Sequence, residues 1–339
     1  MRIAIALTPP TDQFFRWSAQ IGVTDFVARY QFADSLEKLH ETCERSASFG
    51  LKTSVVEGYL PIEPIVHGAR QRDDCIATIK QLIQNMGKLG VGVLCNNWMP
   101  NCDWTRTSVR VPARGGALTN SFDEAKLEAL PAPPEYSSSE VQLWGNLENF
   151  LREVLPVAED ANVKLAMHPD DPPIAFLRGA PQIMHRPEHY ERLFNISDSP
   201  ANRMCFCQGT FSEIGADIPA LIRRFGSKIS YVHFRDVQGV VPSFVETFHD
   251  NGQTDMAAAM RAYYEAGFDG PARPDHVPAL DGETGAGSDG GGYSRNPKLS
   301  IFNLKPGFGS TGIDVGNAPR STTIVMMYAK GLSIGPVRG

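Results

Sequence analysis

The chain has 339 residues, of which 42% are hydrophobic and 21% charged, and its formal net charge is −6 at pH 7. This composition is typical of a globular protein with a sizeable core, and the acidic balance argues against a nucleic-acid or anionic-membrane surface. The 6 cysteines lack the spacing of a disulfide framework, and no apolar run reaches the roughly 18 residues of a membrane helix, so we expect a cytoplasmic protein with reduced thiols.

Short apolar segments alternate with segments of helical periodicity. Strands are expected at Arg2–Leu7, Val23–Ala28, Lys52–Glu57, Val91–Asn97, Lys164–His168, Met204–Gln208, Ile229–Phe234 and Gly270–Asp275. Helices are expected at Gln13–Ile21, Asp34–Phe49, Gln71–Leu89, Ser139–Asn162, Pro187–Asn195, Ser212–Phe225 and Thr254–Ala266. This alternation predicts a single (β/α)8 TIM barrel domain over residues 1–339. A doubly wound sheet is the alternative, which the absence of a glycine-rich fingerprint after the first strand disfavours.

Two segments interrupt the alternation. Residues 99–138 are rich in proline and glycine, and we expect a long loop there. Residues 282–317 form a Gly-rich insertion, flexible in its first part and strand-like in its second. A last helix is expected at Ala318–Leu332. Long loops in compact domains are usually functional or mobile, so both interruptions are of interest.

Polar residues stand at the C-terminal ends of the predicted strands, where TIM barrels carry their active sites. These residues are Glu57, Asn97, His168, Cys207, His233 and Asp275. Two imidazoles, one thiol and one carboxylate make a credible ligand set for a divalent transition metal, with Mn²⁺ or Fe²⁺ leaving room for a substrate. A single strand-end histidine is more often a hydrogen-bonded rim residue, so the prediction depends on the four segments together. His276 is placed to transfer protons beside such a metal.

Other polar side chains flank these positions. Asp170 and Asp171 lie in a proline-rich loop, where they are candidates for orienting a ligating histidine or binding sugar hydroxyls, or are simply solvated acids of a rigid turn. Arg235 suits a substrate carboxylate, and an ion pair with Asp236 is its alternative role.

Within the predicted long loop, Trp104 and Arg106 suit a polyol acid, although a packed loop tryptophan would be equally ordinary. Cys205 lies two residues before Cys207 on the same face of its strand, which leaves a pairing of the two open. His249 follows a predicted strand at the same end of the barrel and is a weaker candidate. The sequence therefore suggests a site assembled from strand ends and from the loops that follow them.

These segments together resemble the mannonate dehydratase family. The matching segments are Cys95–Pro100, Asp103–Thr107, His168–Pro172, Cys205–Thr210, Val232–Asp236 and Arg273–His276. The combination is specific, whereas no single segment would be. The resemblance implies a metal-dependent TIM barrel of the xylose-isomerase-like type. It also implies dehydration of D-mannonate to 2-keto-3-deoxy-D-gluconate in hexuronate catabolism.

The resemblance assigns roles to particular residues. The implied metal ligands are His168, Cys207, His233 and Asp275, and the implied acid/base pair is His276 and Tyr293, without deciding which is the acid. The candidate substrate-binding residues are Asn97, Trp104, Arg106, Asp170, Asp171 and Arg235. The expected partner is a small sugar acid, with no nucleic acid and no membrane, and a homo-oligomer is left open.

A metal-dependent lyase is the leading interpretation of these patterns. A metal-dependent isomerase or epimerase of a neutral sugar is the alternative, but Arg106 and Arg235 argue against it because a neutral sugar needs no carboxylate clamp. A catalytically weak homologue that binds a sugar acid is a third interpretation. A nuclease is least favoured, since the chain is acidic and lacks a stripe of basic and aromatic residues.

Overall fold

The structure, a computed structural model, describes residues 1–101, 104–129 and 138–279. Its main sheet consists of β1 (Arg2–Ala6), β2 (Asp25–Arg29), β3 (Lys52–Glu57), β4 (Val93–Asn96), β7 (Lys164–Met167), β10 (Asn202–Cys207), β11 (Ile229–His233) and β14 (Pro271–Arg273). These strands are parallel and close a barrel in the order β1-β14-β11-β10-β7-β4-β3-β2. The predicted TIM barrel is confirmed, and the doubly wound alternative is wrong.

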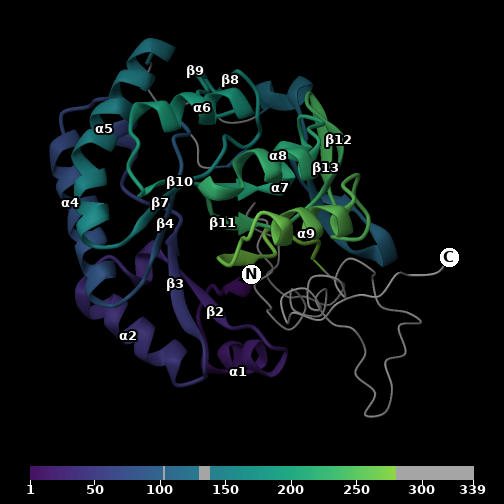
Figure 1. The fold of residues 1–339 in the computed structure, drawn as a ribbon. Coiled ribbons are helices and arrows are strands. Elements are labelled where there is room, and N and C mark those ends of the chain that lie inside the picture. Colours follow the sequence, from purple (N-terminus) through teal and green to yellow (C-terminus); the bar gives the residue numbers. More distant parts are fainter. Residues whose placement is uncertain (102–103, 130–137, 280–339) are drawn as a thin grey trace.

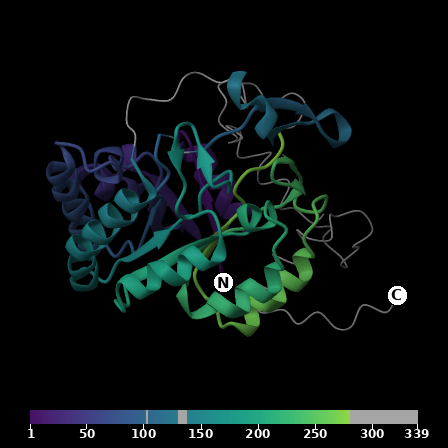
Figure 2. The same cartoon turned by 90° about the horizontal axis from the view of Figure 1, so that it is seen from above.

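Helices surround this barrel on its outside (Figures 1 and 2). They are α1 (Asp12–Gln20), α2 (Leu36–Ala47), α3 (Glu63–Val66), α4 (Arg72–Lys88), α5 (Glu140–Asp160), α6 (Pro187–Ile196), α7 (Gln208–Ser212), α8 (Ile218–Phe225) and α9 (Met256–Glu265). The helix predicted for Ser212–Phe225 begins only at Ile218, as α8, and the separate short helix α7 precedes it and ends at Ser212. Gly215 adopts a φ of 69° between them, and Asp217 then caps a new helix. Among the described residues, no helix combines the length and the hydropathy that a membrane span requires.

Helix α5 shows how the sequence specifies these elements. Ser139 and Gln142 form a reciprocal capping box that satisfies backbone N–H groups at the helix start. Leu143, Leu147 and Val154 recur at helical spacing and are buried on the face that packs against the barrel. Each such fully buried side chain contributes roughly 1.5–3 kcal/mol of burial free energy.

Side chains along each barrel strand alternate between the barrel interior and the surrounding helices. In β3, Val55 belongs to the interior cluster, whereas Val56 belongs to the core beneath the helices. The interior cluster consists of Ala4, Val27, Val55, Val93, Cys95, Ala166, Cys205 and Tyr231. Because the period is two, the residues two positions further along face inward at the C-terminal end of the barrel. They are Glu57, Asn97, His168, Cys207 and His233.

A second sheet covers part of this end of the barrel. The segment 99–138, which the sequence predicts as a long loop, contains β5 (Ser108–Pro112) and β6 (Leu118–Asp123). They join β12 (Val237–Val240) and β13 (Ser243–Glu246) in an antiparallel sheet of order β12-β13-β6-β5. The sheet therefore packs the segment after β4 against the segment after β11. A short hairpin, β8 (Phe176–Leu177) with β9 (Ala180–Pro181), follows β7.

The C-terminal predictions fall outside the described residues. They are the Gly-rich insertion 282–317, the helix Ala318–Leu332 and the candidate proton-transfer residue Tyr293. The last described segment is attached to the second sheet, because Leu118 and Ala279 pair in an antiparallel bridge.

Candidate active site

The four predicted metal ligands lie together at the C-terminal end of the barrel. His168 follows β7, Cys207 ends β10, His233 ends β11, and Asp275 lies two residues beyond β14. Nδ1 of His233 is 3.1 Å from Nε2 of His168 and 3.5 Å from Oδ2 of Asp275. Sγ of Cys207 is 4.0 Å from the same Asp275 oxygen. Ligand atoms of His168, Cys207 and His233 all lie within 4.8 Å of one another.

The hydrogen bonds of the two histidines show that this group suits a cation. Nδ1 of His168 lies 2.7 Å from the carbonyl oxygen of Pro169, which can only accept, so Nδ1 carries the proton. Nε2 of His233 lies 3.2 Å from a carboxylate oxygen of Glu57 and carries the proton there. Two lone pairs therefore face each other across 3.1 Å. Nitrogens that bind one ion at about 2.1 Å and at right angles lie about 3 Å apart, so the residues fit a divalent metal.

Glu57 orients His233 from behind. Its carboxylate is buried and lies 2.6 Å from Arg29, 2.7 Å from Arg273 and 2.7 Å from the hydroxyl of Tyr231. Burial alone would raise the pKa of Glu57, but Arg273 and Arg29 outweigh it and hold that pKa well below its ordinary value. Glu57 is thus an ionised acceptor that fixes the tautomer and the ring orientation of His233.

His276 lies beside the ligand group and is held by Glu246. Nδ1 of His276 is 2.6 Å from Oε1 of Glu246, and its Nε2 is 3.8 Å from Oδ1 of Asp275. The ring of Trp104 contacts that of His276 edge-on, with 5.0 Å between ring centroids. Burial opposes ionisation of Glu246, yet its contacts with His276 and Arg106 lower its pKa to about 2. Sequence reasoning missed Glu246 because its only signal was the end of β13, a strand that was itself not predicted.

Arg106 and Arg235, the candidate carboxylate clamps, are both buried among protein carboxylates. Arg106 lies 2.5 Å from Asp171 and 2.6 Å from Glu246. Arg235 lies 2.6 Å from Asp171, 2.8 Å from Glu213 and 3.1 Å from Asp275. A substrate carboxylate would therefore have to replace one of these partners.

The acids of the Arg235 neighbourhood divide into two kinds. Burial disfavours ionisation of Asp171, but Arg106 and Arg235 lower its pKa far below the usual range. Burial and the adjacent Asp171 raise the pKa of Glu213 well above the usual range. Asp236 accepts hydrogen bonds from Ser212 and Thr254 instead of pairing with Arg235.

Gly209, two residues after the end of β10, occupies a position where only glycine fits. A Cβ atom at this position would fall on the guanidinium of Arg235. Only glycine lets that side chain lie against the start of α7, where Nη2 of Arg235 also donates to the hydroxyl of Thr210 over 3.2 Å. The glycine therefore serves the packing of Arg235 rather than a turn.

A continuous series of buried ion pairs connects the residues around His233 with those around His276. It runs through Arg29, Glu57, Arg273, Asp275, Arg235, Asp171, Arg106, Glu246 and His276. Burying so many charges costs desolvation free energy that mutual attraction offsets only in good geometry. This series of ion pairs holds Nε2 of His233, through Glu57, and Nδ1 of His276, through Glu246, in one framework.

The remaining candidates lie around this framework. Asp170 accepts a hydrogen bond from the backbone N–H of Met184 over 2.5 Å, and burial raises its pKa to about 8. Asn97 accepts from the backbone of Met99 over 3.3 Å. Trp104 covers the guanidinium of Arg106 at 4.8 Å, and its indole N–H is buried without a partner in the described part of the chain. Contacts thus join the four predicted ligands with His276, Trp104, Arg106, Asp171 and Arg235. The side-chain contacts given above for Asn97 and Asp170 are to Met99 and Met184, and Tyr293 lies outside the described residues.

Comparisons with known proteins agree with this geometry. A family model described as D-mannonate dehydratase matches residues 20–133 and 135–305. The mannonate dehydratase of Oceanobacillus iheyensis is 34% identical over 279 residues, covering 74% of this chain and 79% of that protein. The mannonate dehydratase of Thermotoga neapolitana is 34% identical over 292 residues, with the same shares of 74% and 79%.

Solved structures give the same picture. The crystal structure of mannonate dehydratase from Streptococcus suis serotype 2 aligns with a TM-score of 0.80 at 29% identity, covering 90% of this chain and 92% of that one. A D-psicose 3-epimerase from Clostridium cellulolyticum H10 aligns with a TM-score of 0.58 at 13% identity, covering 98% and 99%. The likeness to the epimerase concerns the fold alone.

Proposed function

Because this chain belongs to the D-mannonate dehydratase family, we propose that it is a hydro-lyase that converts D-mannonate to 2-keto-3-deoxy-D-gluconate and water in hexuronate breakdown. The observation that carries the proposal is the convergence of His168, Cys207, His233 and Asp275 beside His276 at the C-terminal end of the barrel. Neutral-sugar epimerases share the fold, but the family match favours a sugar acid.

The four converging residues would hold a divalent metal, and Mn²⁺ or Fe²⁺ suits this mixture of nitrogen, sulfur and oxygen ligands. When bound, the metal supplies a positive charge that stabilises the negative charge developing on the substrate carboxylate as the C2 proton leaves. Glu57 keeps the ligating nitrogen of His233 unprotonated by accepting a hydrogen bond from the opposite one.

His276 is proposed as the base that removes the C2 proton. Its Nδ1–H donates to Glu246, so the lone pair is on Nε2, on the side of Asp275. After proton transfer the imidazolium would be stabilised by the ionised Glu246. The electrons of the C2–H bond form a C2=C3 double bond, the C3–O bond breaks, and the resulting enol becomes the 2-keto acid.

The departing C3 hydroxyl needs a proton to leave as water, and Tyr293 is the proposed donor. Trp104 is proposed to bind a substrate hydroxyl through its indole N–H, which has no partner among the described residues, while its ring packs against His276. Asn97 and Asp170 are proposed to line the same end of the site. Arg106 would act chiefly by holding Glu246 and Arg235 by holding Asp275, with Asp171 pairing with both guanidinium groups. The two arginines would reach the substrate carboxylate only by exchanging a partner.

The experiment is a 2-keto acid assay on D-mannonate and a panel of other aldonates, with metal content measured on the same sample. We expect product from D-mannonate, loss of turnover after chelation, and recovery with Mn²⁺ or Fe²⁺. A metal-loaded protein that forms no keto acid from any aldonate would overturn the proposal. Interconversion of a neutral ketohexose by that protein would instead support the epimerase alternative.

A further inference from the structure

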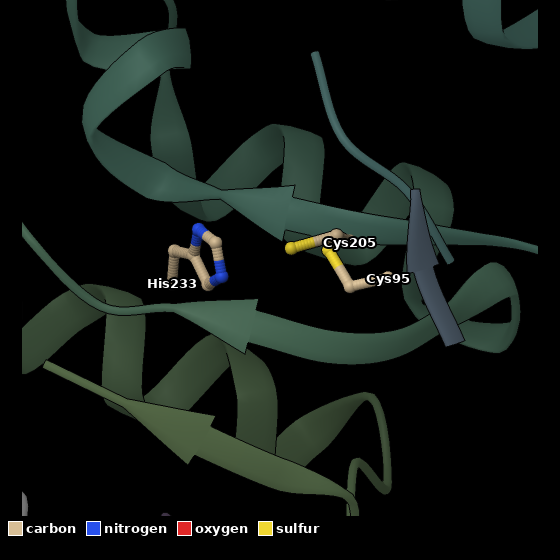
Figure 3. A group of neighbouring side chains, drawn as sticks. All are labelled: Cys95, Cys205 and His233. Atoms are coloured by element: carbon tan, nitrogen blue, oxygen red, sulfur yellow. The ribbon is translucent and has the colours of Figure 1, made fainter. Parts of the chain in front are cut away.

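A second group of ligand-type side chains lies deeper in the barrel. Cys95 of β4, Cys205 of β10 and His233 of β11 place ligand atoms within 4.8 Å of one another. Figure 3 shows the two sulfur atoms side by side, facing the imidazole. Cys95 is 5% exposed, Cys205 0% and His233 3%. Cys95 and Cys205 belong to the interior cluster beneath the ligand set described above, and His233 belongs to both groups.

The two thiols meet without being able to form a disulfide. Strand β7 lies between β4 and β10, so their backbones are two strand spacings apart, or about 9.6 Å. A disulfide needs Cα atoms within roughly 7 Å. Both cysteines are free in the structure. The two sulfurs approach each other although their Cα atoms are too far apart for a disulfide, so a metal ion between the sulfurs could bridge them.

The imidazole presents its Nε2 edge to these sulfurs. Cys95 is the register partner of Glu57 on the adjacent strand, and Glu57 contacts Nε2 of His233. Nδ1 points the other way, toward His168 and Asp275. The lower group therefore offers two sulfurs and one nitrogen, a softer ligand set than the upper group.

We propose that Cys95, Cys205 and Nε2 of His233 form a second metal site, selective for a thiophilic divalent cation such as Cd²⁺ or Zn²⁺. Two thiolates neutralise a divalent ion, and a neutral complex suits a layer lined by Val27, Val55 and Ala166. Each thiol gives its proton to the solvent buffer when the ion binds. Binding through Nε2 requires the proton that His233 donates to Glu57 to move to Nδ1, where Nε2 of His168 accepts it over 3.1 Å. Since a neutral imidazole has one lone pair, an ion in the lower site therefore competes with one in the upper site for His233.

The test is Cd²⁺ loading of the full-length protein, followed by dialysis, metal analysis and the ultraviolet thiolate-to-Cd²⁺ charge-transfer absorption. The unmodified protein and Cys207→Ala are expected to keep a strong band, because the lower sulfurs remain. Cys95→Ala and Cys205→Ala are expected to lose most of it. Cys75→Ala, which changes a cysteine on α4, is the matched control and is expected to match the unmodified protein.

The opposite pattern would overturn the proposal. A band abolished by Cys207→Ala and unchanged by Cys95→Ala means that Cd²⁺ binds only at the upper site, which contains Cys207. X-ray absorption at the cadmium edge on the unmodified protein gives an answer that needs no variant. Two sulfurs per ion support the lower site, and one or none contradicts it. The inference is independent of the proposed activity, because none of these measurements uses D-mannonate.

Discussion

Nδ1 of His276 lies 2.6 Å from Oε1 of Glu246, and this contact joins the segment after β14 to the end of β13. Both side chains are buried, and the carboxylate is also held by Arg106 at 2.6 Å. The imidazole is thereby fixed in one tautomer, with the unprotonated nitrogen Nε2 on the side of Asp275. The second sheet supplies the group that makes His276 a directed base.

Replacement of Glu246 by glutamine is expected to reduce kcat by about 10²–10⁴-fold, because the amide neither fixes this tautomer nor stabilises the imidazolium. Metal content should stay unchanged, since Glu246 does not contact the ligand set. Steady-state kinetics on D-mannonate and elemental analysis check both statements. Glu188→Gln, on the exposed side of α6, is the control. Turnover within twofold of the unmodified protein would show that Glu246 does not position the base.

His276→Asn and Asp275→Asn should separate proton transfer from metal binding, although the residues are adjacent. His276→Asn is expected to keep the metal and lose at least about 10²-fold in kcat. Asp275→Asn and His233→Ala are expected to lose the metal on dialysis, because each removes a ligand. Metal per chain after dialysis and kcat on the same samples give the answer. An active His276→Asn protein would remove this residue from the mechanism.

Glu57→Gln tests the support behind His233. The amide can still accept the Nε2 proton but no longer attracts it with a charge, so metal affinity should fall by about 10–100-fold. Competition with a coloured chelator measures this affinity. Glu153→Gln, an exposed partner of Lys80, is the matched control. Equal affinities for the Glu57→Gln and unmodified proteins would mean that the buried ion pairs of Glu57 serve folding alone.

Arg235→Met distinguishes a framework role from a substrate role. Removing a buried guanidinium leaves Asp171, Glu213 and Asp275 without their shared partner, which is expected to cost roughly 3–5 kcal/mol. The melting temperature should fall sharply even without substrate. A variant of unchanged melting temperature but much higher KM would instead favour the substrate clamp.

The barrel and the convergence of the candidate metal ligands were predictable for the same reason. Strands in a parallel barrel all end at one face, so polar residues that end successive strands must converge there, as His168, Cys207 and His233 do. Their protonation states were not predictable, because these depend on Pro169 and Glu57 as contacts in space.

The second sheet and the ion pairs escaped prediction for a different reason. Strand β6 pairs with β13 across more than a hundred residues, and no local pattern encodes such a pairing. Glu246 was not identified as a site residue because it is the last residue of β13, which was not predicted. The partners of Arg106, which are Asp171 and Glu246, are likewise distant in sequence. An arginine in this loop therefore suggested a residue that binds the substrate carboxylate, whereas its contacts make it part of the buried ion-pair series.

His189 provides a test by pH, away from the ligand set. Arg186 donates to its Nε2 over 2.9 Å, and its Nδ1 is buried without a partner among the described side chains. Burial, followed by the charges of His185 and Arg186, lowers the pKa of His189 to about 4. Above its unfolded pKa, near 6.5, both states are neutral and His189 adds no pH dependence. Between about pH 6.5 and 4 the unfolded chain takes up the proton while the folded protein does not, so stability falls as pH falls.

The His189→Gln variant should lack this loss. Relative to it, the unmodified protein is expected to lose on the order of 2 kcal/mol of unfolding free energy between pH 7.5 and 4.5. Urea midpoints of both proteins at a series of pH values measure this difference. The carboxylates are the same in both proteins, so their contribution to the pH dependence cancels when the two are subtracted. His40→Gln, on the exposed face of α2, should show no such divergence from the unmodified protein. Parallel pH profiles for the unmodified and His189→Gln proteins would mean that His189 takes up its proton as readily in the folded state as in the unfolded chain.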